Sequence, residues 1–499
     1  MVSQDNLFGI EANESPVPVE APVQVNTELD IEQSIIKLAK EFQGVVDDND
    51  FKNCFIIVLF YRFISENYWD IIEKECLFNY VKEQLNKYDN LNDYLKSIFS
   101  KVEKPKYSTE FSSQFEGLFD DFKGLDNRHI KLLFECIGRL NLSNEHTDYF
   151  GFIFEYFLMF YSSNSRKYSG AFFTPVCVSK LLARLVRWDY NGTEREDPYF
   201  RIYDPTCGSG TLLLSTYKEI KRDGFNIKVK GQEINKTSSR LARMNMIINN
   251  IHWYNIECGD TLLNPIHKNE RFDAIVSNPP YSIKWAGSDN PDLLKDERYS
   301  PAGVLAPKGK ADFAFIMHSL YHLKESGSYY GVVFPGILYR DGAEAKIRKY
   351  LIDNNLVKAI IQLPSNLFYG TQISVCIMIL SKNKEEEGVK FVDASNECVK
   401  DGIFNTLTDE NINNISSWVN VPSRIKYRTQ YVTNEEIAKN RYSLTVTQYV
   451  EQEDKKEKID IVALNREIRE LHARNEATYQ KIEACVREMN ELLGIIDEY

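Results

Sequence analysis

The sequence predicts an α/β protein in which an all-helical domain precedes a doubly wound sheet of the Rossmann type and a long helix follows it. Three observations lead to this fold class. From about Tyr149, short apolar runs typical of strands alternate with amphipathic helical stretches, the pattern of an open parallel sheet covered by helices. Residues 28–146 show only helical periodicity, and residues 455–499 form one uninterrupted helical pattern.

The chain divides into four expected segments. Residues 1–27 alternate Pro, Val, Glu and Asn without a period and predict a disordered leader. Residues 28–146 are expected to form a helical amino-terminal domain, residues 147–430 the α/β domain, and residues 431–499 a helical extension. Within the α/β domain, helices are expected over residues 174–188, 210–224, 236–250, 311–327 and 343–355.

Composition excludes several classes of protein. The 499 residues are 43% hydrophobic, which is enough for a large core. Nine cysteines form no CxxC pair, so neither a disulfide framework nor a thiolate metal site is indicated. The richest apolar stretch is broken by Arg62 and Glu66, and the amino terminus has no signal-peptide pattern; we expect no membrane span and a cytoplasmic location. The net charge of −12 implies that any nucleic acid is bound locally or through a partner.

The stretch "YFRIYDPTCGSGTLLL" predicts a strand, a tight glycine turn and the start of a helix. In an open α/β sheet, a nucleotide-like ligand binds at such a turn. The third glycine of a dinucleotide fingerprint is replaced by Leu213, and the carboxylate of Asp204 would repel a pyrophosphate. The turn therefore favours a cationic ligand with an α-amino group, such as S-adenosylmethionine, although an ordinary strand-to-helix turn has the same appearance.

Two further acidic residues follow at the ends of the next two expected strands. The carboxylate of Glu233 can accept hydrogen bonds from both ribose hydroxyls, and that of Asp260 can accept one from an adenine amino group. Either residue alone is more typical of a loop or a helix cap. Three acids at successive strand ends, in order, indicate a shared site.

The motif "SNPPY" ends a fourth expected strand. The exocyclic amine of a base is a poor nucleophile, because its lone pair is delocalised into the ring. The side-chain oxygen of Asn278 and the carbonyl of Pro279 can accept its N–H groups, while the prolines fix the direction of these acceptors. Tyr281 can stack on a base taken out of its helix. The motif therefore predicts a clamp for an aromatic amine.

Four motifs, "GAFFTP" (170–175), "DPTCGSG" (204–210), "NPPY" (278–281) and "LPSNLFYGT" (363–371), resemble those of DNA amino-methyltransferases. The helical "FKNCFIIVLFYRFISENYW" and the late "RYSLTVTQYV" resemble the modification subunit of type I restriction-modification systems. The resemblance spans nearly the whole chain beyond the leader. It implies a seven-stranded methyltransferase core that methylates adenine N6 of double-stranded DNA with S-adenosylmethionine, assembled with a specificity subunit and a restriction subunit, two modification subunits to one specificity subunit.

The resemblance also assigns candidate site residues. The first motif would line the methionine end of the cofactor, with the glycine turn beneath it, and Phe368 would face Tyr281 across the flipped base. Cys207 departs from the usual motif, but the turn is expected to act through its backbone, so the departure should have little effect. The candidate catalytic residues are Asn278, Pro279, Pro280 and Tyr281. The candidate cofactor residues are Gly170, Phe172, Phe173, Thr174, Pro175, Asp204, Gly208, Ser209, Gly210, Thr211, Glu233 and Asp260.

Other functions remain open at this point. Methyltransferases of RNA or of protein glutamine share the tetrapeptide, N4-cytosine is a related acceptor, and the chain could be a non-catalytic assembly subunit. Cytosine C5 chemistry at Cys207 is excluded because the Pro-Cys pair is missing. His318 and His322 have i, i+4 spacing but lack the Glu of HExxH, so no metal is expected.

The last helix carries an apolar heptad seam with one polar position, Asn475. A polar residue in a seam sets the register between partner helices, which favours an intermolecular coiled coil with the specificity subunit over packing on the chain's own domain. The seam residues are Ile461, Leu464, Ile468, Leu471, Asn475, Thr478, Ile482, Cys485, Met489 and Leu492.

Overall fold

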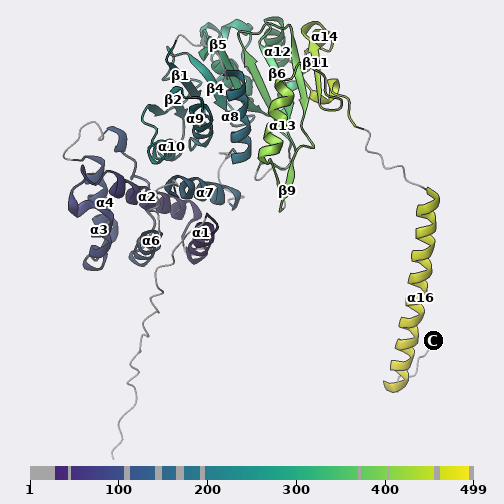
Figure 1. The fold of residues 1–499 in the computed structure, drawn as a ribbon, viewed down its shortest axis with the longest axis horizontal. Helices are drawn as coiled ribbons and strands as arrows, with labels where there is room; N and C mark the ends of the chain where they lie inside the picture. Colours follow the sequence, from purple (N-terminus) through teal and green to yellow (C-terminus); the bar gives the residue numbers. More distant parts are fainter. Residues whose placement is uncertain are drawn as a thin grey trace, which may run out of the picture. The chain divides into compact units, whose positions relative to one another are not determined.

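The computed structural model describes residues 28–42, 46–105, 113–140, 149–164, 174–190, 197–368, 373–402, 404–453 and 461–493. The expected leader, 1–27, lies outside the described residues. The chain forms two compact units, 1–450 and 451–499, and each is described by itself (Figure 1).

A helical domain begins the first unit, as the sequence predicted. Its described elements are α1 (Glu28–Phe42), α2 (Asp48–Asn67), η1 (Lys74–Cys76), α3 (Phe78–Gln84), η2 (Leu85–Lys87), α4 (Leu91–Glu103), α6 (Asn127–Arg139) and α7 (Tyr149–Asn164). Asp47 caps the amino-terminal end of α2, because its side chain accepts from the amide of Asn49 at 2.9 Å.

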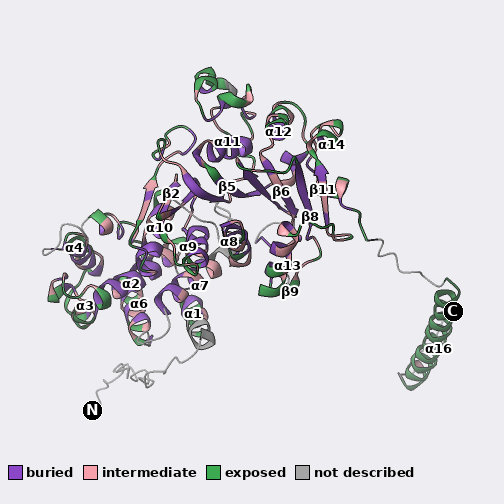
Figure 2. Ribbon diagram, turned by 45° about the horizontal axis from the view of Figure 1, so that its top comes forward, coloured by how far each residue is buried: buried purple, intermediate pink, exposed green. Residues whose placement is uncertain are grey.

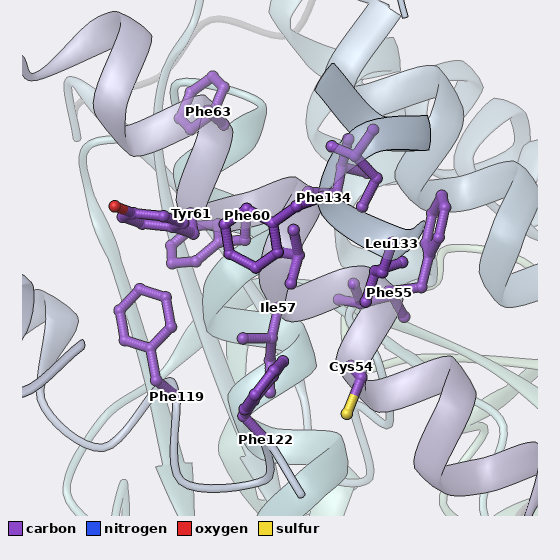
Figure 3. Close-up of a cluster of buried hydrophobic side chains, with 14 of the residues drawn as sticks. Cys54, Phe55, Ile57, Phe60, Tyr61, Phe63, Phe119, Phe122, Leu133 and Phe134 are labelled. Carbon is purple, nitrogen blue, oxygen red and sulfur yellow. The ribbon is translucent and has the colours of Figure 1, made fainter. Parts of the chain in front are cut away.

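Aromatic packing around α2 holds the helical domain together. Nearly every residue of α2 from Cys54 to Ile64 is buried, so other helices contact it on several sides (Figure 3). Phe55 stacks on Phe157 of α7 with ring centroids 3.8 Å apart, and α7 belongs to this core. The helical domain of the structure therefore extends past residue 146, where the sequence had placed its end.

The described part of the α/β domain contains a nine-stranded sheet with the order β11-β8-β6-β7-β5-β4-β1-β2-β3. Strands β1 to β5 pair in parallel, and β7 is antiparallel to both β5 and β6. The strands are β1 (Tyr199–Asp204), β2 (Asn226–Glu233), β3 (Tyr254–Cys258), β4 (Phe272–Ser277), β5 (Leu323–Val333), β6 (Val357–Gln362), β7 (Cys376–Ser381), β8 (Gly388–Asp393) and β11 (Thr429–Thr433).

The Rossmann-like fold class is confirmed, but the sheet has two strands more than the seven expected. Strand β8 pairs in parallel with β6, and β11 pairs antiparallel with β8. Strand β8 was not expected from the sequence, because it contains the charged residue Lys390. In the structure Lys390 is buried, and its ammonium group donates to the carbonyl of Val421 at 2.8 Å, which makes a charged residue compatible with a buried strand.

Helices cover both faces of the sheet (Figure 2). On one face lie α8 (Val176–Tyr190), α9 (Thr211–Lys221), α10 (Lys236–Ile248) and α13 (Asp409–Asn420), and on the other lie α11 (Asp312–His322), α12 (Ala343–Asp353), α14 (Asn434–Lys439) and α15 (Val446–Tyr449). Alternate side chains of β1 divide accordingly: Phe200 and Ile202 enter one core and Tyr203 enters the other, as the period of a strand requires. A small ribbon of β9 (Val399–Asp401) and β10 (Phe404–Thr406) precedes α13.

Two expected boundaries differ from the structure. The helix expected over 311–327 ends at His322, because Leu323 already pairs with Phe272 of β4, and the register shift that follows leaves 324–327 as an irregular start of β5. Residues 431–450, which the sequence grouped with the extension, lie in the first unit, because β11, α14 and α15 complete the sheet and its cover.

The second unit contains α16 (Ile461–Leu493), whose described side chains are exposed apart from the half-buried Asn490. Its seam residues are among them: Leu471 is 51% and Met489 57% exposed. Such exposed apolar side chains in a row require a partner to be covered. Among the described helices, none is both long enough and apolar enough to cross a membrane.

Candidate active site

The glycine turn joins β1 to α9 at the carboxyl edge of the sheet. The amide of Cys207 donates to the carbonyl of Gln232 at 3.1 Å, and the amide of Gly210 donates to the carbonyl of Cys207 at 2.8 Å. Gly210 has a φ of +80° and precedes α9, and a Cβ there would lie 3.1 Å from Met246. Glycine is therefore favoured at 210 by its positive φ, and a Cβ there would also displace Met246 by a few tenths of an ångström.

Asp204 ends β1 and is almost fully buried beside this turn. One of its carboxylate oxygens accepts from the amide of Thr206 at 2.9 Å. Burial raises the pKa of Asp204 to about 8, with the negative charge of Glu233 adding to the effect and the Thr206 amide opposing it. A cationic group bound in the turn would favour the charged carboxylate, which fits the type of ligand that the sequence indicated.

Glu233 links the glycine turn to the next strand. One carboxylate oxygen accepts from the amide of Gly208 at 3.0 Å and the other accepts from the amide of Asn235 at 2.9 Å. Each oxygen keeps a further lone pair, so a ligand hydroxyl can still be accepted. Glu233 thus supports the turn as well as offering acceptors to a ligand.

Asp260 follows β3 and caps the turn after it. Its Oδ1 accepts from the amides of Leu262 at 2.9 Å and Leu263 at 3.1 Å, which is the capping role that the sequence left open. The next residue, Thr261, donates its hydroxyl to the carbonyl of Pro205 at 2.6 Å. This bond ties together the loops that follow β1 and β3.

The structure brings the expected methionine-end motif and the amine clamp into contact. The side-chain amide of Asn278 donates to the hydroxyl of Thr174 at 2.9 Å. The hydroxyl of Tyr281 donates to Oδ1 of Asn278 at 2.8 Å, and burial raises the pKa of Tyr281, so the phenol stays a donor. Thr174 and Asn278 are far apart in the sequence but adjacent in space.

The backbone after the two prolines is fixed by α11, a contact that the sequence did not reveal. Ser282 has a φ of +51°, and its amide donates to both carboxylate oxygens of Asp312 at 3.2 Å. The amide of Ala311 donates to the carbonyl of Ile283 at 3.0 Å. Burial raises the pKa of Asp312. The only signal in the sequence was an acid at the start of an apolar helix.

The remaining candidate residues have weaker structural support. Phe368 is 1% exposed and belongs to the hydrophobic core against which Tyr281 also packs, so a base could reach its ring only after a local rearrangement. Five further candidates are neighbours in sequence of the residues whose contacts are described above: Pro175, Ser209, Thr211, Pro279 and Pro280. Gly170, Phe172 and Phe173 lie outside the described residues, and their role remains a prediction.

A buried arginine braces the loop after Asp260. Arg298 donates through its two terminal nitrogens to the carbonyls of Thr261 at 2.9 Å and Leu262 at 2.8 Å, and it lies 3.0 Å from Nδ1 of His318. Burial holds the pKa of His318 well below its usual value, so the imidazole is neutral and can accept this hydrogen bond. His318 is thus a structural acceptor. Among the described residues, no group of three or more His, Cys, Asp or Glu side chains could hold a metal ion.

The chain is similar in sequence to a known family and to several known proteins. Residues 145–458 match the family described as N-6 DNA Methylase. The chain is 35% identical to the type I restriction enzyme MpnII methylase subunit of Mycoplasma pneumoniae, over 94% of this chain and 97% of that protein. It is 30% identical to the MjaVII methylase subunit of Methanocaldococcus jannaschii, over 89% of this chain and 80% of that protein.

Solved structures show the same fold. The type I restriction-modification methyltransferase subunit from Streptococcus thermophilus aligns with a TM-score of 0.77 and 29% identity, covering 85% of this chain and all of that one. A modification subunit of a type I restriction enzyme from Vibrio vulnificus aligns with a TM-score of 0.60 and 14% identity, covering 82% of this chain and 93% of that one.

Proposed function

This chain belongs to the N-6 DNA methylase family, and we propose that it transfers a methyl group from S-adenosylmethionine to N6 of adenine in DNA. In this proposal it is the modification subunit of a type I restriction-modification complex, and methylation protects the host DNA. The hydrogen bond between Thr174 and Asn278 at 2.9 Å is the observation that carries it. It joins the motif expected at the methionine end of the cofactor to the motif expected at the target amine.

The residues at the carboxyl edge suit S-adenosylmethionine. Glu233 and Asp260 offer carboxylate oxygens to ribose and adenine, and the tight turn at Gly210 lets the backbone approach a ligand closely. When bound, the cofactor supplies an activated methyl group on a positively charged sulfur. The raised pKa of Asp204, about 8, indicates a carboxyl group whose charged form lacks a counter-charge, which a cationic ligand would provide.

Asn278 is proposed to accept one N–H of the adenine amine through Oδ1, while the carbonyl of Pro279 accepts the other. An amide oxygen has two lone pairs, so Oδ1 can keep its bond from Tyr281 at 2.8 Å when the amine arrives. Thr174 holds the other end of the amide, so Asn278 needs no reorganisation to act, as pre-organised polar groups in active sites require. The base would be flipped from the helix onto Tyr281, with Phe368 as the second wall.

The assembly that we propose follows from charge and from α16. The net charge of −12 favours a partner that helps to hold DNA, since phosphate contacts require clustered cations. The exposed apolar seam of α16 is proposed to bind the specificity subunit, with two modification subunits to one specificity subunit, and the restriction subunit completes the complex. Because the proposed substrate is host DNA, we also propose a cytoplasmic location.

The test is a competition between acceptors. The complex of this chain with its specificity subunit is incubated with tritium-labelled S-adenosylmethionine and a mixture of host DNA, RNA and protein. The proposal predicts label in DNA, lost when Asn278 is replaced by Ala. Label in RNA or protein would favour the related methyltransferases, and no label with a folded, cofactor-binding complex would favour a non-catalytic assembly subunit.

A further inference from the structure

We propose that Asn245 is a positioning residue that couples the helical domain to the glycine turn, so that the docking of this domain sets the affinity for the cofactor. The inference rests on the proposed function in one respect, because it takes the glycine turn to be part of the cofactor site. The observations that carry it are separate from those that carry the function.

Asn245 lies in the last turn of α10 and is fully buried. Its side-chain nitrogen is 3.2 Å from the carbonyl of Ser209 in the glycine turn and 3.4 Å from Oε1 of Glu155 in α7. Its oxygen accepts from the side chain of Asn249 at 3.0 Å. One amide group therefore connects the turn to a helix of the amino-terminal domain.

Apolar packing makes α10 a wall shared by both parts. Leu241, Met244, Ile247 and Ile248 of α10 belong to the core of the helical domain. On the other side Ala242 and Met246 belong to the core under the sheet, and both lie against Gly210, where a Cβ would be 3.3 Å and 3.1 Å from them. Helix α10 contacts α9 on the sheet side and α2 and α7 on the helical side, as Figure 1 shows.

Two arginines of α10 add directional contacts to this docking. Arg243 donates to the carbonyls of Ser113 at 3.1 Å, Gln114 at 2.7 Å and Glu116 at 3.0 Å. Arg240 pairs with Asp120 and with Asp121, the latter at 2.9 Å. These bonds hold the segment before α6 against α10 at a fixed position, because a guanidinium group presents its donors in a rigid fork.

A displacement of the helical domain must therefore either break these contacts or move α10. If α10 moves, the bond from Asn245 to Ser209 and the contact of Met246 with Gly210 change together. The turn tolerates little change, because Gly208 and Gly210 both have positive φ and the amide of Gly208 is already engaged by Glu233. Docking of the helical domain thus controls the shape of the turn that receives the cofactor.

The experiment compares four variants of the full chain. Asn245→Ala removes the coupling amide, and Arg243→Ala weakens the docking without touching the turn. Asn249→Ala leaves the side-chain oxygen of Asn245 without its donor, so it disturbs the same amide from its acceptor side. Lys236→Ala, which removes an exposed cation of α10, is the matched control. Affinity for S-adenosylmethionine is measured by calorimetry, and turnover in the complex with the specificity subunit.

We expect Asn245→Ala to raise the dissociation constant about tenfold, the order of one lost hydrogen bond at a pre-formed site, with turnover at saturating cofactor within about twofold of the wild type. Arg243→Ala and Asn249→Ala should raise the dissociation constant several-fold in the same pattern, and the Lys236→Ala control should stay within about twofold of the wild type. Hydrogen exchange at residues 208–212 without cofactor should be faster in these three variants and unchanged in Lys236→Ala.

Cofactor affinity within twofold of the wild type in both Asn245→Ala and Arg243→Ala would overturn the inference. If Asn245→Ala does not fold, the Arg243→Ala result and its Lys236→Ala control decide. A wild-type chain that fails to bind S-adenosylmethionine would defeat the proposed function instead, and the exchange measurement would then decide the coupling alone: unchanged exchange in both variants overturns it.

Discussion

Replacing Glu233 by Ala should raise the dissociation constant for S-adenosylmethionine by at least about tenfold. The carboxylate is proposed to accept the ribose hydroxyls, and a hydrogen bond to a charged group contributes about 1.5 to 3 kcal/mol. Loss of one such bond corresponds to about a 10- to 100-fold higher dissociation constant. Glu233 is half-buried, so the lower end of this range applies to each bond.

The structure adds a second consequence of the same change. Glu233 also accepts from the amide of Gly208 at 3.0 Å, and an amide left without its acceptor costs about 1 to 3 kcal/mol. Urea denaturation of the variant should therefore show a lower free energy of unfolding even without cofactor. Glu257→Ala is the matched control, since it removes a half-buried carboxylate from the neighbouring strand β3.

Calorimetric titration of S-adenosylmethionine into the folded Glu233→Ala chain is the assay. An affinity equal to that of the wild type would refute the assignment of Glu233 to the cofactor. A loss of affinity in Glu257→Ala as large as in Glu233→Ala would show that the effect belongs to the edge of the sheet in general and not to this residue.

Three other changes have defined outcomes. Asn278→Ala should lower methyl transfer by about 10²-fold, the size of an oxyanion-hole deletion, with cofactor affinity unchanged by calorimetry; wild-type turnover would refute its role. Burial raises the pKa of Asp204 to about 8. The stability that the protonated carboxyl group contributes without cofactor is therefore complete at acid pH and is lost as the pH rises towards 8. Urea denaturation between pH 5 and 9 should show a smaller decline in the free energy of unfolding for Asp204→Asn than for the wild type, and an equal decline in both would contradict this cause. Deletion of residues 455–499 should block assembly with the specificity subunit but leave cofactor binding intact, and co-purification of an active complex would refute it.

Much of the candidate site could be predicted because its residues lie at the ends of strands. Asp204, Glu233 and Asn278 each follow an apolar run, and parallel strands bring their carboxyl ends to one edge. The sequence therefore shows these residues through local pattern alone. The helical domain could also be predicted, because residues 28–146 show helical periodicity and no strand pattern.

The residues that hold the site in place were not predictable in this way. Asn245, Arg298 and Asp312 act through contacts with distant loops, and no local pattern distinguishes them from ordinary helix or loop residues. His318 has the spacing of a metal ligand but accepts from Arg298. Strand β8 was missed because the charge of Lys390 is satisfied by carbonyls that only the folded chain supplies.

The identity of the methylated base separates methylation of adenine N6 from the other reactions that this fold could catalyse. DNA treated with the complex of this chain and its specificity subunit is digested to nucleosides, and the methylated species is identified by mass spectrometry, with the Asn278→Ala complex as the blank. We expect N6-methyladenine as the product that appears with the wild type and is absent from the blank. N4-methylcytosine, or N6-methyladenine formed equally by the Asn278→Ala complex, would contradict it.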